Sequence, residues 1–222
     1  MRTLYHLWLS PLSRKVRLVM AEKKLDFEMK IERTWERRDE FLSLNPTGKV
    51  PVLVEDDGSV IADSTAICEY LDELHPDPPL IGQGPGSRAE ARRLVAWFDE
   101  KFRVEVSDNL IGEKVNKHFL GLGEPSVEAI RAGIANLKIH LDYISWLADS
   151  RKWLAGDEMS LADLAAAAHL SAIDYLGDVP WEDFPRAKEW YVRLKSRPSF
   201  RPLLKDRIPG LAPPKHYANL DF

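Results

Sequence analysis

The sequence predicts an α+β protein with two domains, an N-terminal domain built on a mixed β-sheet and an all-α C-terminal domain. Over about the first 75 residues, strand and helix patterns follow the order β-α-β-α-β-β-α, which is typical of a mixed sheet covered by helices. Residues 75–87 hold four prolines and three glycines and cannot continue a helix. Beyond them the patterns are helical, with no convincing strand.

The first elements follow from hydrophobic periodicity. Residues 2–7 alternate and are rich in strand formers, so we expect a strand there. Residues 13–23 then place Val16, Val19 and Met20 on one face of a helix. The basic residues of this helix fall largely outside that face: Arg14, Lys15, Arg17 and Lys23.

The rest of the N-terminal domain is expected to hold three strands and two helices. Residues 27–33 form a second strand and residues 36–45 a short helix. Residues 50–55 and 59–63 form a hairpin, because Asp57-Gly58 suits a tight turn that needs positive φ. A helix over 64–75 follows, with Ser64 as the expected N-cap and an apolar stripe that includes Ile67 and Leu71.

Four long helical patterns make up the second half, over residues 88–106, 126–149, 161–177 and 184–197. Ser160 and Asp163 match a capping box before the third of them, and Met159 can pack on Leu164. We therefore divide the chain into a first domain (1–76), a linker (77–87), a helical domain (88–206) and a proline-rich C-terminal tail (207–222).

Composition excludes several classes of protein. The net charge is −4 and the basic residues are scattered, so no nucleic-acid surface is expected. No apolar run reaches the roughly 18 residues of a membrane span, and the N-terminus lacks the order of a signal peptide. Cys68 is the single cysteine and sits in a helix, which predicts a buried apolar residue, no metal site and a reducing cytoplasm. His6 and His169 are expected to be core histidines with satisfied hydrogen bonds.

Pro51 stands where a strand begins, and a proline cannot donate a ladder hydrogen bond. A cis Val50-Pro51 bond would turn the backbone and leave the neighbouring N–H and C=O groups free to meet a ligand. The alternative is a trans proline on an edge strand.

Two helix starts carry hydroxyl groups. Ser10 and Ser13 lie where the first strand gives way to a helix, and the N-terminus of that helix favours an anion such as a thiolate. Asp63 and Ser64 stand at a second helix start, where Ser64 could bind a carboxylate and Asp63 an amine. The alternative in both places is a plain helix cap, by Ser13 in the first and Ser64 in the second.

The segments SPLSRKVR, NPTGKVPVL, ADSTAICEYL, the proline-rich linker, GDEMSLADL and RPSF together resemble the glutathione S-transferase superfamily, over residues 1 to about 205. The resemblance implies a thioredoxin-like first domain, an all-α second domain and a homodimer. It also implies Ser10 as the group that stabilises the glutathione thiolate, with Val50, Pro51, Asp63 and Ser64 binding glutathione as a cosubstrate. The electrophile would lie between the domains, against Trp97, Phe98 or Phe102.

Two features do not serve such a site. Trp35 stands among charged residues in a segment expected to be exposed, which is the composition of a protein-binding surface or a cover for the domain's own edge. The tail carries Tyr217 and an apolar, acidic end, which is expected to dock on a partner or on the helical domain. The partner-binding set is therefore Trp35, Arg37, Arg38, Phe41, Tyr217, Leu220, Asp221 and Phe222.

The tail and the RTWERRDEF segment resemble a branch of the superfamily whose members bind the bacterial division filament protein FtsZ and are not detoxifying enzymes. On this resemblance we expect a cytoplasmic homodimer that binds FtsZ filaments and other division proteins and regulates cell division, with little or no transferase activity. The alternative is an enzyme that conjugates glutathione to a small electrophile, with Ser10 as thiolate stabiliser.

Overall fold

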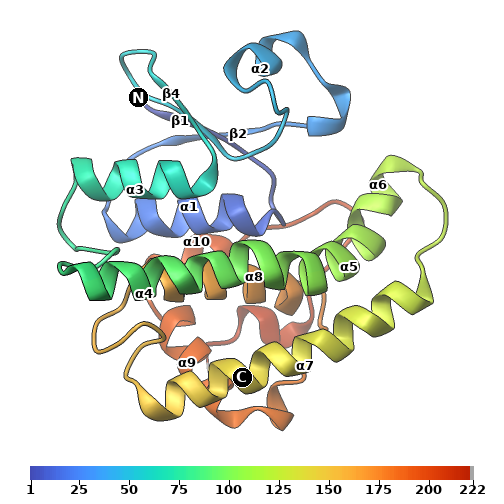
Figure 1. Cartoon of the computed structure of the whole chain (residues 1–222). Coiled ribbons are helices and arrows are strands. Elements are labelled where there is room, and N and C mark those ends of the chain that lie inside the picture. The colour runs from blue at the N-terminus through green and yellow to red at the C-terminus, as the bar shows by residue number, and fades with distance from the viewer. Residues whose placement is uncertain (221–222) are drawn as a thin grey trace.

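A computed structural model describes residues 1–220 and confirms the α+β class. The sheet lies at one end of the molecule, and two helices separate it from a larger helical layer (Figure 1). The N-terminal elements are β1 (Thr3–His6), α1 (Pro11–Glu22), β2 (Glu28–Ile31), the 3₁₀ turn η1 (Thr34–Glu36), α2 (Asp39–Leu44), β3 (Val52–Val54), β4 (Val60–Ala62) and α3 (Ser64–Leu74).

The four strands form one mixed sheet in the order β2-β1-β3-β4. β1 runs parallel to β2 and antiparallel to β3, and β3 and β4 form the expected hairpin. Alternation along β1 and β3 gives the sheet two buried faces. Leu4 and Leu53 belong to the main core, while Tyr5 and Val52 join a smaller cluster around Phe41 of α2.

The helical domain is dominated by one long helix. Its pieces α4 (Pro85–Ala96), η2 (Trp97–Ser107), α5 (Asp108–Ile111), η3 (Gly112–Asn116) and α6 (Lys117–Leu120) are continuous, since the backbone at every junction stays right-handed helical. We expected a helix that ended at Val106. η2 and η3 are π-helical, and their wider turns shift the apolar stripe, so a 3.6-residue period loses the pattern.

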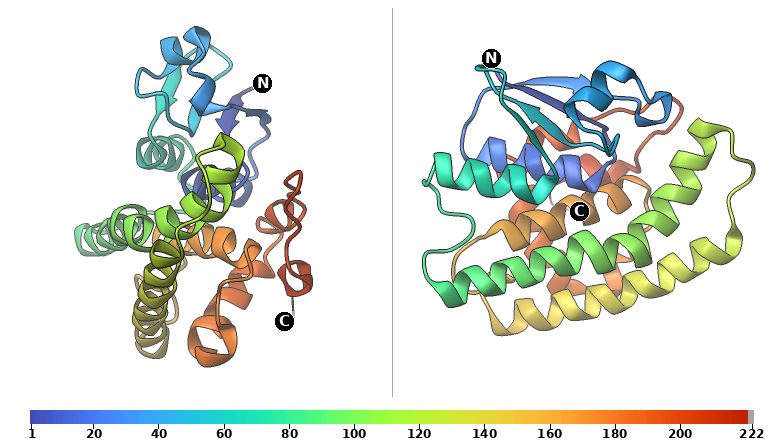
Figure 2. Two further views of the ribbon diagram at one scale, coloured as in Figure 1. Left: turned by 90° about the vertical axis from the view of Figure 1, so that its right-hand side faces the viewer. Right: turned by 45° about the horizontal axis from the view of Figure 1, so that its top comes forward.

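The remaining helices are α7 (Val127–Ser150), α8 (Leu161–Tyr175), the 3₁₀ turn η4 (Trp181–Asp183), α9 (Pro185–Lys195), α10 (Arg201–Leu204) and the 3₁₀ turn η5 (Lys215–Ala218). Every residue of α8 is buried, and this helix packs against α1, α4 and η2. The capping box of Ser160 and Asp163 is present as predicted. Two further views show the sheet on one side of α1 and α3 and the helical layer on the other (Figure 2).

The basic residues of α1 and of its C-cap are buried, although the sequence places them largely outside the apolar face. Arg14 and Lys15 are fully buried, and Arg17 and Lys23 nearly so. Each is paired with a carboxylate remote in sequence: Arg14 and Arg17 with Asp206, Lys15 with Asp99, and Lys23 with Asp72. Burial of a charge is tolerated when such partners are present, and a helical pattern alone cannot show them.

Other core predictions have mixed outcomes. Cys68 is buried, and burial raises the pKa of its thiol to about 12. His169 is satisfied, with Nδ1 2.9 Å from the Ser107 hydroxyl and Nε2 3.3 Å from the Asp99 carboxylate. His6 is fully buried, which confirms a core histidine, but neither ring nitrogen has a hydrogen-bond partner within residues 1–220, so the expectation of satisfied hydrogen bonds is wrong for His6. In the part of the chain that the structure describes, no helix is both long enough and apolar enough to span a membrane.

Candidate functional site

One end of the sheet gathers the loop after β1, the start of β3 and the end of β4. The pairs Tyr5–Val52 and Val52–Ala62 place these three segments side by side. α1 and α3 both begin at this end, because each follows directly on a strand or its loop. Their first-turn N–H groups and the positive ends of their dipoles therefore point toward one region, which favours an anionic ligand.

Ser10 is the N-cap of α1. It is half-buried, and its hydroxyl accepts a hydrogen bond from the Ser13 N–H at 3.2 Å. The predicted alternative of a cap by Ser13 is wrong, because Pro11 begins the helix one residue after Ser10 and so places Ser13 within the first turn. Ser13 is fully buried, and its hydroxyl has no partner among the described residues.

The Val50-Pro51 peptide bond is cis, as predicted. β3 begins one residue later, at Val52, and both Val50 and Pro51 are buried. Within residues 1–220 the N–H and C=O groups of Val50 form no hydrogen bond. These two groups are thus free to pair with an extended ligand at the end of the sheet.

Asp63, rather than Ser64, caps α3. Its carboxylate accepts hydrogen bonds from the N–H groups of Thr65 at 2.8 Å and Ala66 at 3.3 Å. Asp63 is exposed and has a φ of +76°, a conformation rare outside glycine. Ser64 is the first helical residue and is buried. Ser10, Val50, Pro51, Asp63 and Ser64 therefore lie at the same end of the sheet.

The three aromatic residues assigned to an electrophile pocket do not line an open cleft. Phe98 and Phe102 are fully buried, because they lie on the side of η2 that packs against α7 and α8. Trp97 is half-buried, and its indole N–H donates to His140 Nδ1 at 3.1 Å. A small molecule could reach the two phenylalanines only by displacing core side chains.

A shallow groove of about 460 Å³ lies instead on the outer side of α4 and η2. Its lining is a single helical stripe with Trp97 and Val104 as apolar members: Arg93, Ala96, Trp97, Glu100, Lys101, Val104 and Glu105. Lys101 lies over the Trp97 ring, 5.6 Å from its centroid. Sequence reasoning placed Trp97 in a ligand pocket and did not identify this surface.

The predicted partner-binding residues fall into three groups. Trp35 on η1 is 45% exposed, and Arg37 and Arg38 beside it are exposed as well. Phe41 and Tyr217 are in the core, at 1% and 0% exposure, so no partner can reach them. Phe41 packs on Tyr5, and Tyr217 fills the space beside Arg14 and Tyr175.

The end of the tail is divided between described and undescribed residues. Leu220 is half-buried and packs against the main core. Asp221 and Phe222 lie outside the described residues. Of the eight partner-binding residues predicted from sequence, the structure therefore presents three together on the surface: Trp35, Arg37 and Arg38.

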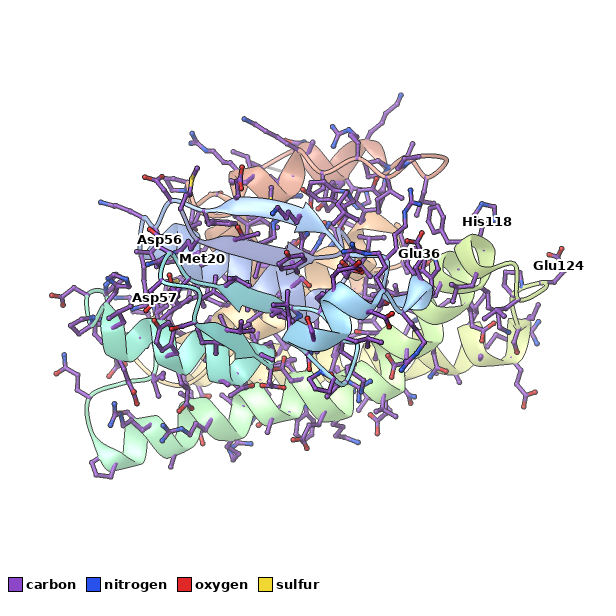
Figure 3. The ribbon with its side chains drawn as sticks, turned by 90° about the horizontal axis from the view of Figure 1, so that it is seen from above. Met20, Glu36, Asp56, Asp57, His118 and Glu124 are labelled. Atoms are coloured by element: carbon purple, nitrogen blue, oxygen red, sulfur yellow. The ribbon has the colours of Figure 1, made fainter. Side chains whose placement is uncertain are left out.

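An exposed apolar tip was missed by sequence reasoning. Phe119, Leu120 and Leu122 are 44%, 37% and 64% exposed, and Val127 at the start of α7 is 61% exposed. We call these four residues the α6 tip. Seen from above, Glu36 next to Trp35 lies toward the end of the molecule that carries His118 and Glu124, and the turn with Asp56 and Asp57 lies at the opposite end (Figure 3). The signal in the sequence is HFLGLG, an apolar run broken by glycines at a helix end.

A polar chain that joins the two domains was also missed. Lys15 of α1 bonds to Thr65 of α3 and to Asp99 of η2, and Asp99 accepts from His169 of α8. Burial opposes ionisation of Asp99, yet Lys15 and His169 lower its pKa below the ordinary value. Through Thr65 and the ion pair of Lys15 with Asp99, these side chains therefore fix the start of α3 relative to the helical domain.

Comparison with known proteins agrees with this geometry. The family model for the N-terminal domain of glutathione S-transferases matches residues 9–74, and the model for the C-terminal domain matches residues 135–198. The chain belongs to the glutathione S-transferase family. Its sequence is 56% identical to that of FtsZ-localized protein A of Caulobacter vibrioides, over all of this chain and 98% of that protein.

Two solved structures share the whole fold of this glutathione S-transferase family member. The crystal structure of a glutathione S-transferase from Rhodospirillum rubrum F11 superposes with a TM-score of 0.97 at 59% identity, covering 100% of both chains. FzlA from C. crescentus superposes with a TM-score of 0.97 at 55% identity, covering 100% of this chain and 99% of that one. The similarity therefore includes the tail as well as both domains.

Proposed function

We propose that this chain is a cytoplasmic, homodimeric binding protein that associates with the division filament protein FtsZ and regulates cell division, with little or no transferase activity. The observation that carries the proposal is the full-length similarity to FtsZ-localized protein A. Other division proteins are further partners in this proposal.

The surface around Trp35 supports a protein partner. A tryptophan that is 45% exposed and flanked by Arg37 and Arg38 has the composition of a binding hot spot. Arg38 is held by the buried carboxylate of Glu32, while Arg37 forms no ion pair within the described residues. A carboxylate on the partner can therefore pair with Arg37 without breaking an existing contact.

Co-sedimentation with FtsZ polymers tests the proposal. Trp35→Ala is expected to weaken binding at least tenfold, because a central interface tryptophan contributes about 2 kcal/mol or more. Trp146→Ala is the matched control, since Trp146 is 60% exposed on α7, in the other domain. Equal pelleting of the wild type and Trp35→Ala would refute the role of Trp35, and no pelleting of the wild type would refute the function.

The groove on α4 and η2 supports the homodimer. Trp97 and Val104 give it an apolar centre, and its rim alternates Arg93 and Lys101 with Glu100 and Glu105. Two copies related by a twofold axis can pair these opposite charges. Val104→Glu is expected to give a monomer in light scattering, while Val127→Glu, at a similarly exposed position, leaves the dimer intact. A monomeric wild type, or a dimeric Val104→Glu variant, contradicts this assignment.

The convergence of Ser10, Val50 and Asp63 favours a second function, conjugation of glutathione to an electrophile. Two helix N-termini and the free N–H and C=O groups of Val50 suit an anionic, peptide-like ligand. Retention on immobilised glutathione that is lost in Ser10→Ala and Ser64→Ala would support the enzyme. Absence of retention in the wild type would leave the binding protein as the function.

A further inference from the structure

Arg14 of α1 joins three distant parts of the chain. Its side chain is fully buried, and Nε donates to the Trp8 carbonyl oxygen at 2.7 Å. Nη1 donates to the Ser171 hydroxyl at 2.9 Å and to the Tyr217 hydroxyl at 3.1 Å, and Nη2 donates to Asp206 at 3.3 Å. One guanidinium thus connects the loop before α1, the central helix α8 and the C-terminal segment.

Trp8 lies two residues before Ser10, so its position sets where the Ser10 loop runs. Its ring meets His6 edge-on at 4.7 Å, and the Arg17 guanidinium lies 5.2 Å from its centroid. Arg17 also donates two hydrogen bonds of 2.8 Å to Asp206. Both the carbonyl and the ring of Trp8 are therefore in contact with arginines that Asp206 anchors.

The C-terminal segment completes this cluster through Tyr217. The side chain is fully buried, and its hydroxyl accepts from Arg14 and donates to the Leu203 carbonyl oxygen at 3.1 Å. Tyr217 also packs edge-on against Tyr175 at 5.1 Å. The segment from Asp206 to Tyr217 therefore supplies two of the four acceptors of the Arg14 guanidinium.

We infer that the C-terminal segment positions the loop that carries Ser10, with Arg14 as the positioning residue between them. A buried guanidinium that loses the Tyr217 acceptor is drawn toward Ser171 and Asp206, which misaligns its Nε–H bond to the Trp8 carbonyl. The coupling is reciprocal: a change that moves Tyr217 out of its site loosens the Ser10 loop, and a ligand that orders the loop holds Tyr217 in place. This linkage goes beyond FtsZ binding and does not depend on which ligand the site takes.

Hydrogen exchange of the full-length protein, read by mass spectrometry on peptides covering residues 7–13, tests the inference. Tyr217→Phe removes the hydroxyl that Arg14 needs and keeps the ring. Tyr175→Phe is the matched control, since the Tyr175 hydroxyl is also buried but bonds to the Leu211 carbonyl and the Ile208 N–H instead. Either change deletes one hydroxyl from the same aromatic pair.

Tyr217→Phe is expected to speed exchange over residues 7–13 by about three- to tenfold, the effect of one lost hydrogen bond on local opening, with β3 and β4 unchanged. Tyr175→Phe is expected to speed exchange only near residues 208–211. Arg14→Lys, whose single ammonium cannot reach all four acceptors, is expected to match Tyr217→Phe. The inference is overturned if residues 7–13 exchange at the wild-type rate in Tyr217→Phe, or if both tyrosine variants speed exchange equally throughout the protein.

Discussion

Replacement of Asp163 by alanine tests how the start of α8 is held. The buried carboxylate accepts hydrogen bonds from the N–H of Leu154 at 2.9 Å, the N–H of Ser160 at 3.0 Å and the indole N–H of Trp190 at 2.9 Å. These donors come from the loop before α8, the N-cap itself and α9. Asp163→Ala leaves all three without their acceptor.

The size of the effect follows from these contacts. A hydrogen bond to a charged group contributes about 1.5 kcal/mol at the low end, so three contribute about 4.5 kcal/mol. Burial raises the pKa of Asp163, and this desolvation offsets part of the gain. We therefore expect a loss of about 3–4 kcal/mol in unfolding free energy, which for a chain of this length lowers Tm by roughly 10 °C.

Urea unfolding followed by circular dichroism and tryptophan fluorescence measures this loss. Asp157→Ala is the control, because Asp157 is an exposed carboxylate in the same loop. Its unfolding free energy should stay within about 0.5 kcal/mol of the wild type. A midpoint for Asp163→Ala that coincides with that of Asp157→Ala would show that the three donors do not depend on this carboxylate.

Three further predictions concern buried titratable groups. Burial and the nearby Arg17 lower the pKa of His6 from 6.5 to about 4. As pH falls, the unfolded chain therefore binds a proton at His6 before the folded protein does. The unfolding free energy should drop by about 3 kcal/mol between pH 6.5 and 4 in the wild type but not in His6→Phe. A matching drop in the variant, measured by urea unfolding, would exclude His6 as the source. Cys68, with its pKa raised to about 12, should react with a thiol reagent only in denaturant, and rapid native labelling would contradict its burial. Lys15→Met should lower the unfolding free energy by about 3–5 kcal/mol, because it leaves the charge of Asp99 unpaired. The double variant Lys15→Met with Asp99→Leu should lose less. An equal or larger loss in the double variant would mean that the ion pair stabilises the fold on balance.

Much of the fold could be predicted because it depends on local patterns. Each predicted feature depends on residues only a few positions apart in the chain. This holds for the individual strands and helices of the β-α-β-α-β-β-α order, for the proline-rich break and for the capping box of Ser160 and Asp163. The cis bond before Pro51 and the gathering of residues near Ser10 followed from motifs of this local kind and from the family resemblance.

What sequence reasoning missed depends on partners far apart in the chain. The buried ion pairs of Arg14 with Asp206 and of Lys15 with Asp99 could not be predicted, because the two carboxylates lie far from α1 in the sequence. Phe98 and Phe102 read as pocket residues because the helical pattern does not show which side packs against α7 and α8. A single sequence carries the periodicity of a helix but not the identity of what covers each side.

The unbroken helix from Pro85 to Leu120 also sets a length scale. At 1.5 Å per residue it measures roughly 50 Å. Its outer side forms the groove at Val104, and its far end carries Phe119 and Leu120 of the α6 tip. In a dimer joined along that groove, this helix would hold the two α6 tips at a fixed separation. A polymer that contacts both tips would then have to present its binding sites at that same separation.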